Sequence, residues 1–157
     1  MPADSEPELV ALPKVYRPFG VRMAVYVFGA MLFLTTAVIW FTFPQSVRDQ
    51  FTLFQRGTVL VLGLGFFSLG WGMARSRVVA RREGLTVVNG YRTYTYEWSE
   101  VLAVNLRRGS PWATLDLSDG TTASAIGIQG SDGARAVRQV KELRALVATY
   151  SRTEHDR

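Results

Sequence analysis

The chain contains no cysteine and only one histidine, His155, among its 157 residues. Without cysteine there is no disulfide framework, no thiolate nucleophile and no thiolate ligand for a metal. A single histidine supplies neither a catalytic dyad nor a cluster of imidazole ligands. Glu97 and Glu100 form a carboxylate pair, but no partner group is positioned beside them in the sequence. We therefore expect a protein that is not an enzyme and that holds neither a metal ion nor a cofactor.

Charged residues are also missing from two long apolar segments, residues 23–43 and residues 57–74. As a helix, each segment is long enough to cross a hydrocarbon core about 30 Å thick. One Arg or Asp at the bilayer centre costs about 2.5–3.5 kcal/mol, so an unbroken apolar run favours insertion. The lack of ionisable side chains inside both runs argues against a transporter, a channel or an intramembrane active site. We predict a transmembrane helical hairpin over residues 21–75, with spans at about 22–43 and 57–74.

Two other interpretations of these segments fit the sequence less well. A helical hairpin buried in a soluble core would need more covering chain than the remaining residues provide. A cleaved signal peptide has an apolar region of about 7–15 residues, which is shorter than the first run. Small residues recur at spacings of four in the second run, as in Ser68 with Gly72 and Gly70 with Ala74. This spacing fits contact with the first span and homo-oligomerisation through the transmembrane helices equally well.

The charges that flank the two runs predict an orientation. Lys and Arg are more numerous outside the hairpin than in the connection between its spans. Both outer flanks of a two-span hairpin lie on one side, and the positive-inside rule assigns that side to the cytoplasm. We expect a plasma (inner) membrane protein with cytoplasmic N- and C-termini. The residues expected to anchor it at the membrane surfaces are Arg22, Trp40, Trp71, Arg75 and Arg77.

The rest of the chain divides into two tails and one small domain. Residues 1–20 are rich in proline and acidic residues, which predicts a disordered tail, and residues 151–157 form a polar tail. Between them, residues 76–150 show alternating apolar residues and turn signals, followed by a helix. Asn89-Gly90 and Asp119-Gly120 mark hairpin turns; an Asn-Gly turn of the common type has both residues at positive φ. The expected strands are residues 78–82, 85–88, 91–98, 101–106, 112–117 and 121–128.

The side-chain pattern also predicts which faces are buried. Tyr94, Tyr96 and Trp98 should share one face of their strand. Leu102, Val104 and Leu106 should share one side of the next. The helix, which ends at about Tyr150, should bury one apolar stripe against the open end of the bent sheet. That stripe comprises Val137, Val140, Leu143, Val147 and Tyr150.

Several short segments carry a resemblance to a known family. They are Arg82-Glu83-Gly84-Leu85-Thr86-Val87, Asn89-Gly90, Trp98-Ser99-Glu100-Val101, Ser110-Pro111-Trp112, Leu117-Ser118-Asp119-Gly120 and Gly127-Ile128-Gln129-Gly130-Ser131-Asp132-Gly133. With the strand and helix pattern, they resemble the bacterial PH-like domain family of small two-pass membrane proteins, the low molecular weight protein antigen 6 type. The resemblance implies an α+β domain: an antiparallel six- or seven-stranded bent sheet or barrel, capped by a C-terminal helix.

The resemblance also raises two points of detail. A full PH barrel has a seventh strand, which here would come from splitting residues 121–129 at Gly127 or would be absent. In many eukaryotic PH domains, basic residues around the loop between the first two strands bind phosphoinositides. In this sequence, that loop is expected at Arg82-Glu83-Gly84. The family carries no established ligand over to this chain, and its shared residues support a fold better than an activity.

The candidate ligand-binding residues are arginines, because a guanidinium fork matches phosphate oxygens. They are Arg81, Arg82, Arg92, Arg107 and Arg108. A solvated or membrane-facing surface explains the same residues. The net charge of +5 suits nucleic acid, but the membrane hairpin and the lack of a dense basic stripe argue against it. The favoured hypothesis is a membrane-anchored module that binds a protein partner or serves assembly. The alternative is a sensor of anionic lipid headgroups at the inner leaflet.

Overall fold

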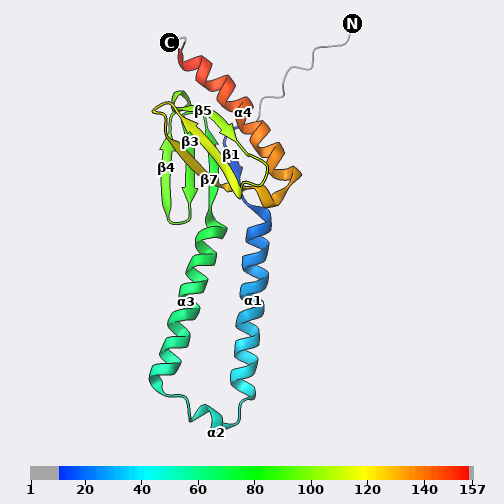
Figure 1. Ribbon diagram of the computed structural model, residues 1–157, viewed down its shortest axis with the longest axis vertical. Helices are drawn as coiled ribbons and strands as arrows, with labels where there is room; N and C mark the ends of the chain where they lie inside the picture. The colour runs from blue at the N-terminus through cyan, green and yellow to red at the C-terminus, as the bar shows by residue number, and fades with distance from the viewer. Residues whose placement is uncertain (1–10, 156–157) are drawn as a thin grey trace. The chain divides into compact units, whose positions relative to one another are not determined.

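The computed structural model describes residues 11–155 (Figure 1). The chain folds into two compact units. One is Phe19–Arg75, and the other combines the residues up to Pro18 with the residues from Ser76 onward. The first unit is therefore an insertion in the sequence of the second.

The inserted unit consists of α1 (Phe19–Thr42), α2 (Gln45–Arg48) and α3 (Leu53–Arg75). By length and composition, α1 and α3 could each cross a membrane. The two helices approach closely at Gly70, where an added Cβ would lie 3.2 Å from Cγ1 of Val25. An added Cβ at Gly63 or Gly65 would meet no atom within 4 Å. Gly70 thus lies in the contact between α1 and α3, whereas Gly63 and Gly65 face open space.

The connection between α1 and α3 is held by Arg56. Its guanidinium donates hydrogen bonds to the carbonyl oxygens of Arg48 (2.7 Å) and Phe51 (3.1 Å). It also lies 5.5 Å from the ring centre of Trp40. Thr52 and Gln55 exchange backbone and side-chain hydrogen bonds of 2.9 and 3.2 Å, which is a capping box. This cap explains why α3 begins at Leu53, earlier than the apolar run itself.

The second unit contains two antiparallel sheets. Sheet A has the order β1-β2-β3-β4, and sheet B has the order β5-β6-β7. The strands of sheet A are β1 (Lys14–Tyr16), β2 (Arg77–Arg81), β3 (Gly84–Asn89) and β4 (Arg92–Tyr96). Those of sheet B are β5 (Val101–Asn105), β6 (Trp112–Leu117) and β7 (Thr122–Gln129). The remaining elements are the short helices η1 (Trp98–Glu100) and η2 (Gly130–Asp132) and the long helix α4 (Ala134–His155).

Residues 14–16 belong to sheet A, so the prediction of a disordered tail up to residue 20 is wrong there. In β1, Tyr16 lies opposite Val78 of β2 and is only 1% exposed. Lys14 forms an ion pair with Glu142 of α4 at 3.6 Å. Three residues between prolines carry too little periodicity to be recognised as a strand. The last two residues of the predicted tail, 19 and 20, belong to a helix, and residues 1–10 lie outside the described part of the chain.

With β1 included, the domain has seven strands within the described residues. Both expectations for the seventh strand are wrong, because β7 runs unbroken from Thr122 to Gln129. The connection between the first two strands is the whole segment 17–76. Arg82-Glu83-Gly84, which was expected to form that connection, instead joins the second strand to the third.

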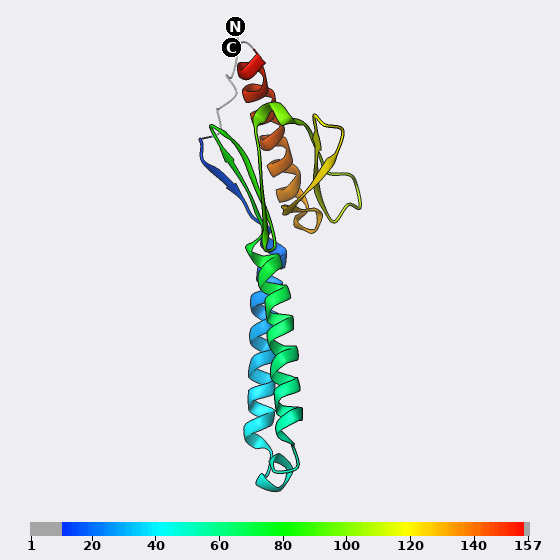
Figure 2. The same ribbon diagram turned by 90° about the vertical axis from the view of Figure 1, so that its left-hand side faces the viewer.

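α4 covers the open end between the two sheets, as Figure 2 shows. Its buried side chains are Ala136, Gln139, Val140, Leu143, Leu146 and Val147. Val137, predicted to lie in the buried stripe, is 62% exposed. The helix also continues past Tyr150 to His155, so part of the expected polar tail is helical.

An irregularity in β5 changes its buried face. The pairing of β5 with β6 shifts register between Val101 and Ala103, which is the effect of a β-bulge. Val101 and Val104 are consequently both buried, while Leu102 is 65% exposed. The prediction that Leu102 shares the core side with Val104 is therefore wrong.

The two sheets are joined where β7 crosses sheet A. An added Cβ at Gly127 would lie 2.6 Å from Cα of Arg77, so only glycine permits this crossing. Beside it, the Asn89 side chain donates to the carbonyl oxygen of Ser124 (2.6 Å) and accepts from the N–H of Ile126 (3.1 Å). The sequence predicted Asn89 only as a turn residue. The structure gives it a second role between the sheets.

The turn between β3 and β4 differs from the expected one. Asn89 pairs with Arg92, so Gly90 and Tyr91 are the two central residues of the turn. Gly90 has a φ of 60°, and no described non-glycine residue has a positive φ. This matches a turn with glycine at its first central position, and not a turn with two positive φ values. Register is then fixed along the whole of β4.

Trp98 lies after β4 instead of on it. It is 1% exposed in η1, and its indole N–H donates to the carbonyl oxygens of Arg81 (3.0 Å) and Arg82 (3.2 Å). Its ring stacks on Tyr150 of α4 at a centroid distance of 5.4 Å. Trp98 thereby connects the β2–β3 turn to the C-terminal helix.

Candidate binding surfaces

Arg81 and Arg82 stand at the turn between β2 and β3. Both side chains are exposed, and Arg81 donates to the hydroxyl of Thr86 at 3.2 Å. The turn is tight because Gly84 lies against the carbonyl oxygen of Tyr96, where any Cβ would clash. The loop therefore presents its two arginines and Glu83 to solvent.

Arg92 lies at the opposite end of sheet A. It pairs with Asn89, whereas Arg81 pairs with Gly84 at the other end of β3. At about 3.3 Å per residue, the length of β3 separates the two positions. Arg92 and the Arg81–Arg82 pair therefore cannot contact one small headgroup together.

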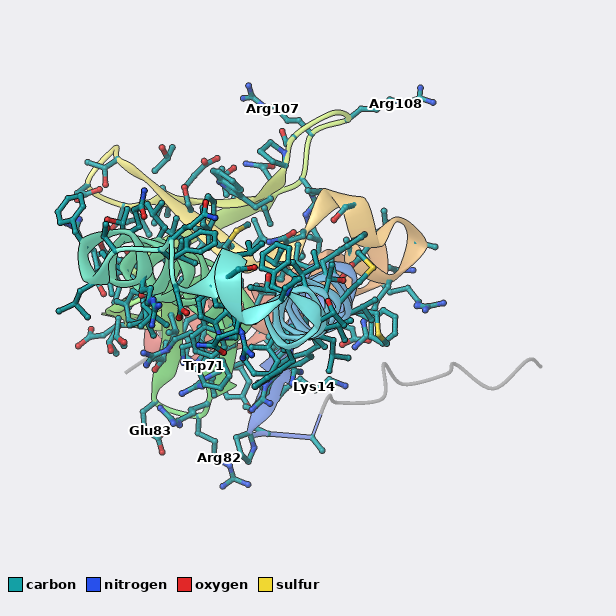
Figure 3. All side chains as sticks on the ribbon, turned by 90° about the horizontal axis from the view of Figure 1, so that it is seen from below. Lys14, Trp71, Arg82, Glu83, Arg107 and Arg108 are labelled. Carbon is teal, nitrogen blue, oxygen red and sulfur yellow. The ribbon has the colours of Figure 1, made fainter. Side chains whose placement is uncertain are left out.

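Arg107 and Arg108 belong to the loop between β5 and β6. Figure 3 shows both of them well apart from Arg82 and Glu83. The loop borders an open groove of about 560 Å³, whose other wall is formed by η2 and the first turn of α4. Gly130 donates to the carbonyl oxygen of Pro111 at 2.9 Å, which holds the base of the loop. Exposed Val137 adds an apolar side chain to the groove.

The five candidate arginines are thus distributed over three separate places. A single cationic patch made of all five is not formed. Arg107 and Arg108 are the two that border a groove, although both side chains are exposed.

The expected anchoring residues are spread along the chain. Arg22 lies in the first turn of α1, and Trp40, near its end, packs edge-on against Phe51. Trp71 stacks on Phe67 within α3 and remains 44% exposed. Arg75 is the last residue of α3. Arg77 is the first residue of β2 and belongs to the sheet.

One exposed surface was not predicted from the sequence: the free edge of sheet A. Among the described strands, β4 pairs only with β3, and its side chains from Arg92 to Thr95 are exposed. Tyr91 in the preceding turn is 60% exposed and Tyr94 is 40% exposed. The alternation Arg-Thr-Tyr-Thr-Tyr marked the strand, but alternation within one strand does not reveal that no further strand follows it in the sheet.

Carboxylates lie near the end of β4 that contains Tyr96, and Arg81 and Arg82 stand in the neighbouring β2–β3 turn. Burial raises the pKa of Tyr96, and the neighbouring Tyr94, Glu100 and Asp119 raise it further. Hydrogen bonds from the Thr121 hydroxyl (2.7 Å) and N–H (2.8 Å) lower the pKa of Asp119 and keep it ionised. The Glu100 carboxylate accepts from the N–H of Glu97 at 2.7 Å. These carboxylates serve turns and caps, and they also set the charge around Tyr96.

Metal-binding side chains are not grouped in the described part of the domain. Within residues 11–155, no three His, Cys, Asp or Glu side chains are placed so that they could hold a metal ion. The surfaces described above are an exposed strand edge, loops that carry arginines, and an open groove.

Comparison with known proteins agrees with this fold. The family model described as bacterial PH domain matches residues 75–146. Uncharacterised proteins of two strains of Mycobacterium tuberculosis and of Mycobacterium bovis are each 33% identical over 105 residues, which is 67% of this chain. The match spans 64% of the length of these curated relatives. No solved structure matches the chain significantly.

The family match begins at residue 75, after the inserted helices, and so leaves out β1. The inserted helices separate this first strand from the other six in sequence. Fold and comparison lead to one assignment: the part of the chain from residue 75 to residue 146 belongs to the bacterial PH domain family.

Proposed function

We propose that this chain is a two-pass protein of the bacterial plasma membrane that presents its PH domain to the cytoplasm as a non-enzymatic protein-interaction or assembly module. The observation that carries the proposal is the point of insertion. The apolar hairpin leaves the domain after β1 and returns to it at β2, and these strands are paired neighbours.

This connectivity fits a membrane hairpin for a topological reason. A hairpin with two spans begins and ends on the same side of a bilayer, and paired strands require both of its ends to be on one side. The exposed apolar side chains of α1 and α3 give independent support. Phe33, Phe41 and Phe66 are 73%, 75% and 69% exposed. An apolar surface of this extent needs lipid or protein to cover it.

The orientation can be measured with single cysteines, because the chain has none of its own. Gln50→Cys lies in the connection between α1 and α3, and Ser118→Cys lies in the β6–β7 turn; both positions are exposed. In intact spheroplasts, an impermeant maleimide should label Gln50→Cys, and it should label Ser118→Cys only after lysis. Labelling of Ser118→Cys from outside would contradict the proposed orientation, and loss of the protein from the membrane on carbonate washing would contradict the anchor.

The interaction role can be tested in cells with a photoreactive amino acid. Exposed positions on different surfaces serve as probes: Thr95 on β4, Leu102 on β5 and Arg108 in the groove loop. A defined adduct from some positions but not from others would support a partner-binding surface. The same weak adducts from every position would count against it.

A lipid sensor is the second candidate, and the groove beside Arg107 and Arg108 favours it. Cationic side chains near an anionic leaflet contribute about 1 kcal/mol each. An environment-sensitive dye on Ser131→Cys, at the groove wall, would report headgroups in nanodiscs of equal charge but different lipid. A headgroup-specific response that Arg107→Gln with Arg108→Gln removes would favour the lipid sensor. An equal response to all headgroups would favour the protein-interaction role.

A further inference from the structure

β4 offers unpaired backbone groups at the edge of sheet A. Its register follows from the two-residue turn, which makes Asn89 and Arg92 a hydrogen-bonded pair. Backbone groups alternate along an antiparallel strand, so those of Arg92, Tyr94 and Tyr96 point toward β3. The N–H and C=O groups of Thr93 and Thr95 therefore point away from the sheet.

Other strand edges of the domain are protected in ways that β4 is not. β1 has only three residues. On β5, the Arg144 guanidinium donates to the carbonyl oxygen of Val104 at 2.7 Å, and a bulge interrupts the strand. β4 contains no proline, no lysine and no register shift, and its only charge is Arg92 at its start. Short length, bulges, charges and proline are the usual defences of an edge strand, so β4 is an edge left open to pairing.

Side chains along β4 suit recognition of an extended chain. Tyr94 and Tyr96 lie opposite the core residues Val87 and Leu85 and therefore on the inner face of the sheet. Tyr96 packs on the core, whereas Tyr94 is partly exposed beside it. Tyrosine and arginine, together with tryptophan, are enriched among the residues that dominate binding at protein interfaces.

The charges near the two ends of β4 differ in sign. Arg92 is positive at one end, and Glu97 follows the strand at the other, close to Glu100. Asp119 and Glu100 both act on Tyr96 at that end. Arg81, at the same end of sheet A, donates to Thr86, which lies opposite Thr95 on the other face of the sheet. On the face of Tyr96 the charge is therefore negative. A cationic side chain next to Tyr96 would complement it.

We propose that β4 captures an extended segment of a partner protein as a fifth strand of sheet A, with a Lys or Arg beside Tyr96 and an apolar side chain beside Tyr94. The inference rests on the proposed function as a protein-interaction module and names the surface and the chemistry of its partner. Main-chain hydrogen bonds to Thr93 and Thr95 supply affinity, and the two tyrosine positions supply specificity.

The test uses the full chain in nanodiscs as bait for a phage-displayed library of short random peptides. The enriched peptides should carry a basic residue two positions from an apolar one, which is the spacing that places both on one face of a strand. Thr95→Pro removes one outward N–H without touching the β3–β4 ladder, and should weaken binding of the selected peptides by about tenfold. Thr95→Val keeps the backbone groups and should change binding by less than about twofold.

A second variant tests the charge independently. Glu97→Gln with Glu100→Gln removes two negative charges, and the amide that replaces the Glu100 carboxylate still has an oxygen that can accept from the backbone N–H of residue 97. Binding of the selected peptides should weaken by about threefold or more and lose part of its salt dependence. Circular dichroism checks that each variant is folded.

Four results would overturn the inference. They are no enrichment, enrichment of acidic peptides, equal binding to Thr95→Pro and the wild type, and a chain dimer that Thr95→Pro dissolves and that peptides do not displace. The last result would make a second copy the occupant of the edge. If photo-adducts formed from Leu102 or Arg108 and none from Thr95, the interaction role would stand and only the β4 surface would be rejected.

Discussion

Tyr16 lies opposite Val78 in sheet A, although the entire apolar hairpin separates the two residues in the sequence. Both side chains are buried in the core, at 1% and 0% exposure. The pair closes the domain across the insertion. The stability of the PH domain should therefore depend on this closure, and on the contacts that join its two sheets.

The buried hydroxyl of Tyr16 has no hydrogen-bond partner among the described residues. Removing it in Tyr16→Phe should raise the free energy of unfolding by about 1 kcal/mol, because an unsatisfied polar group leaves the core. Tyr16→Ala should lower it by about 3–5 kcal/mol, because a cavity remains. Chemical denaturation of the full chain in detergent measures both variants. A Phe variant as unstable as the Ala variant would mean that the hydroxyl is needed.

Alkaline pH should affect this residue with a definite sign. Burial, and after it the nearby Glu142 carboxylate, raises the pKa of Tyr16 above its ordinary value. The stability linked to a raised pKa is complete below the unfolded value of about 10 and is lost as the pH rises above it. In thermal melts, the melting temperature of Tyr16→Phe should therefore fall less steeply than that of the wild type as the pH rises from neutral to strongly alkaline. Identical alkaline profiles would contradict the burial of this phenol.

β1 should be required for the PH domain to fold. A fragment that begins at Ser76 lacks Tyr16 and exposes the edge of β2, so we expect it to be unstable or to aggregate. A fragment in which residues 11–18 are joined to residues 76–155 by a short Gly-Ser linker should be soluble and should melt cooperatively, since β1 and β2 are antiparallel neighbours. Equal stability of the two fragments would show that β1 is dispensable.

Asn89 should contribute to the contact between the sheets. Asn89→Ala leaves the carbonyl oxygen of Ser124 and the N–H of Ile126 without this partner, which should cost about 1–3 kcal/mol of unfolding free energy. Ser124→Ala is the matched control, because only the Ser124 backbone accepts the bond, and it should change stability by less than about 0.5 kcal/mol. A neutral Asn89→Ala would show that water replaces the side chain without loss.

Two glycines of α3 should respond differently to a large side chain. Gly70→Leu forces a side chain into the contact with Val25 and should destabilise the packing of α1 on α3 by about 1–3 kcal/mol. Gly63→Leu projects into open space and should leave the hairpin unchanged. Thermal melts in detergent compare the two. If Gly63→Leu instead lowers the oligomer fraction in chemical crosslinking, the open glycines pack against a second copy.

The amino-acid sequence determined those features that depend on neighbours along the chain. The charge-free runs located α1 and α3, and period-two alternation located six strands, because side chains of a strand alternate between its faces. Turn residues separated the strands, and the amphipathic pattern located α4. Short segments of the sequence, among them the turn residues, also indicated the bacterial PH domain family. Arg107 and Arg108 were recognised as a basic loop, although nothing local predicted the groove beside them.

The tertiary structure alone decided the features that depend on distant residues. β1 is a strand only because β2 pairs with it and the core accepts Tyr16, since three residues have no periodicity of their own. The bulge in β5 exposes Leu102, and the position of α4 on the sheets exposes Val137. The separation of Arg92 from Arg81, the bridge from Asn89 to β7 and the free edge of β4 follow from strand order, and strand order is set by packing, not by local sequence.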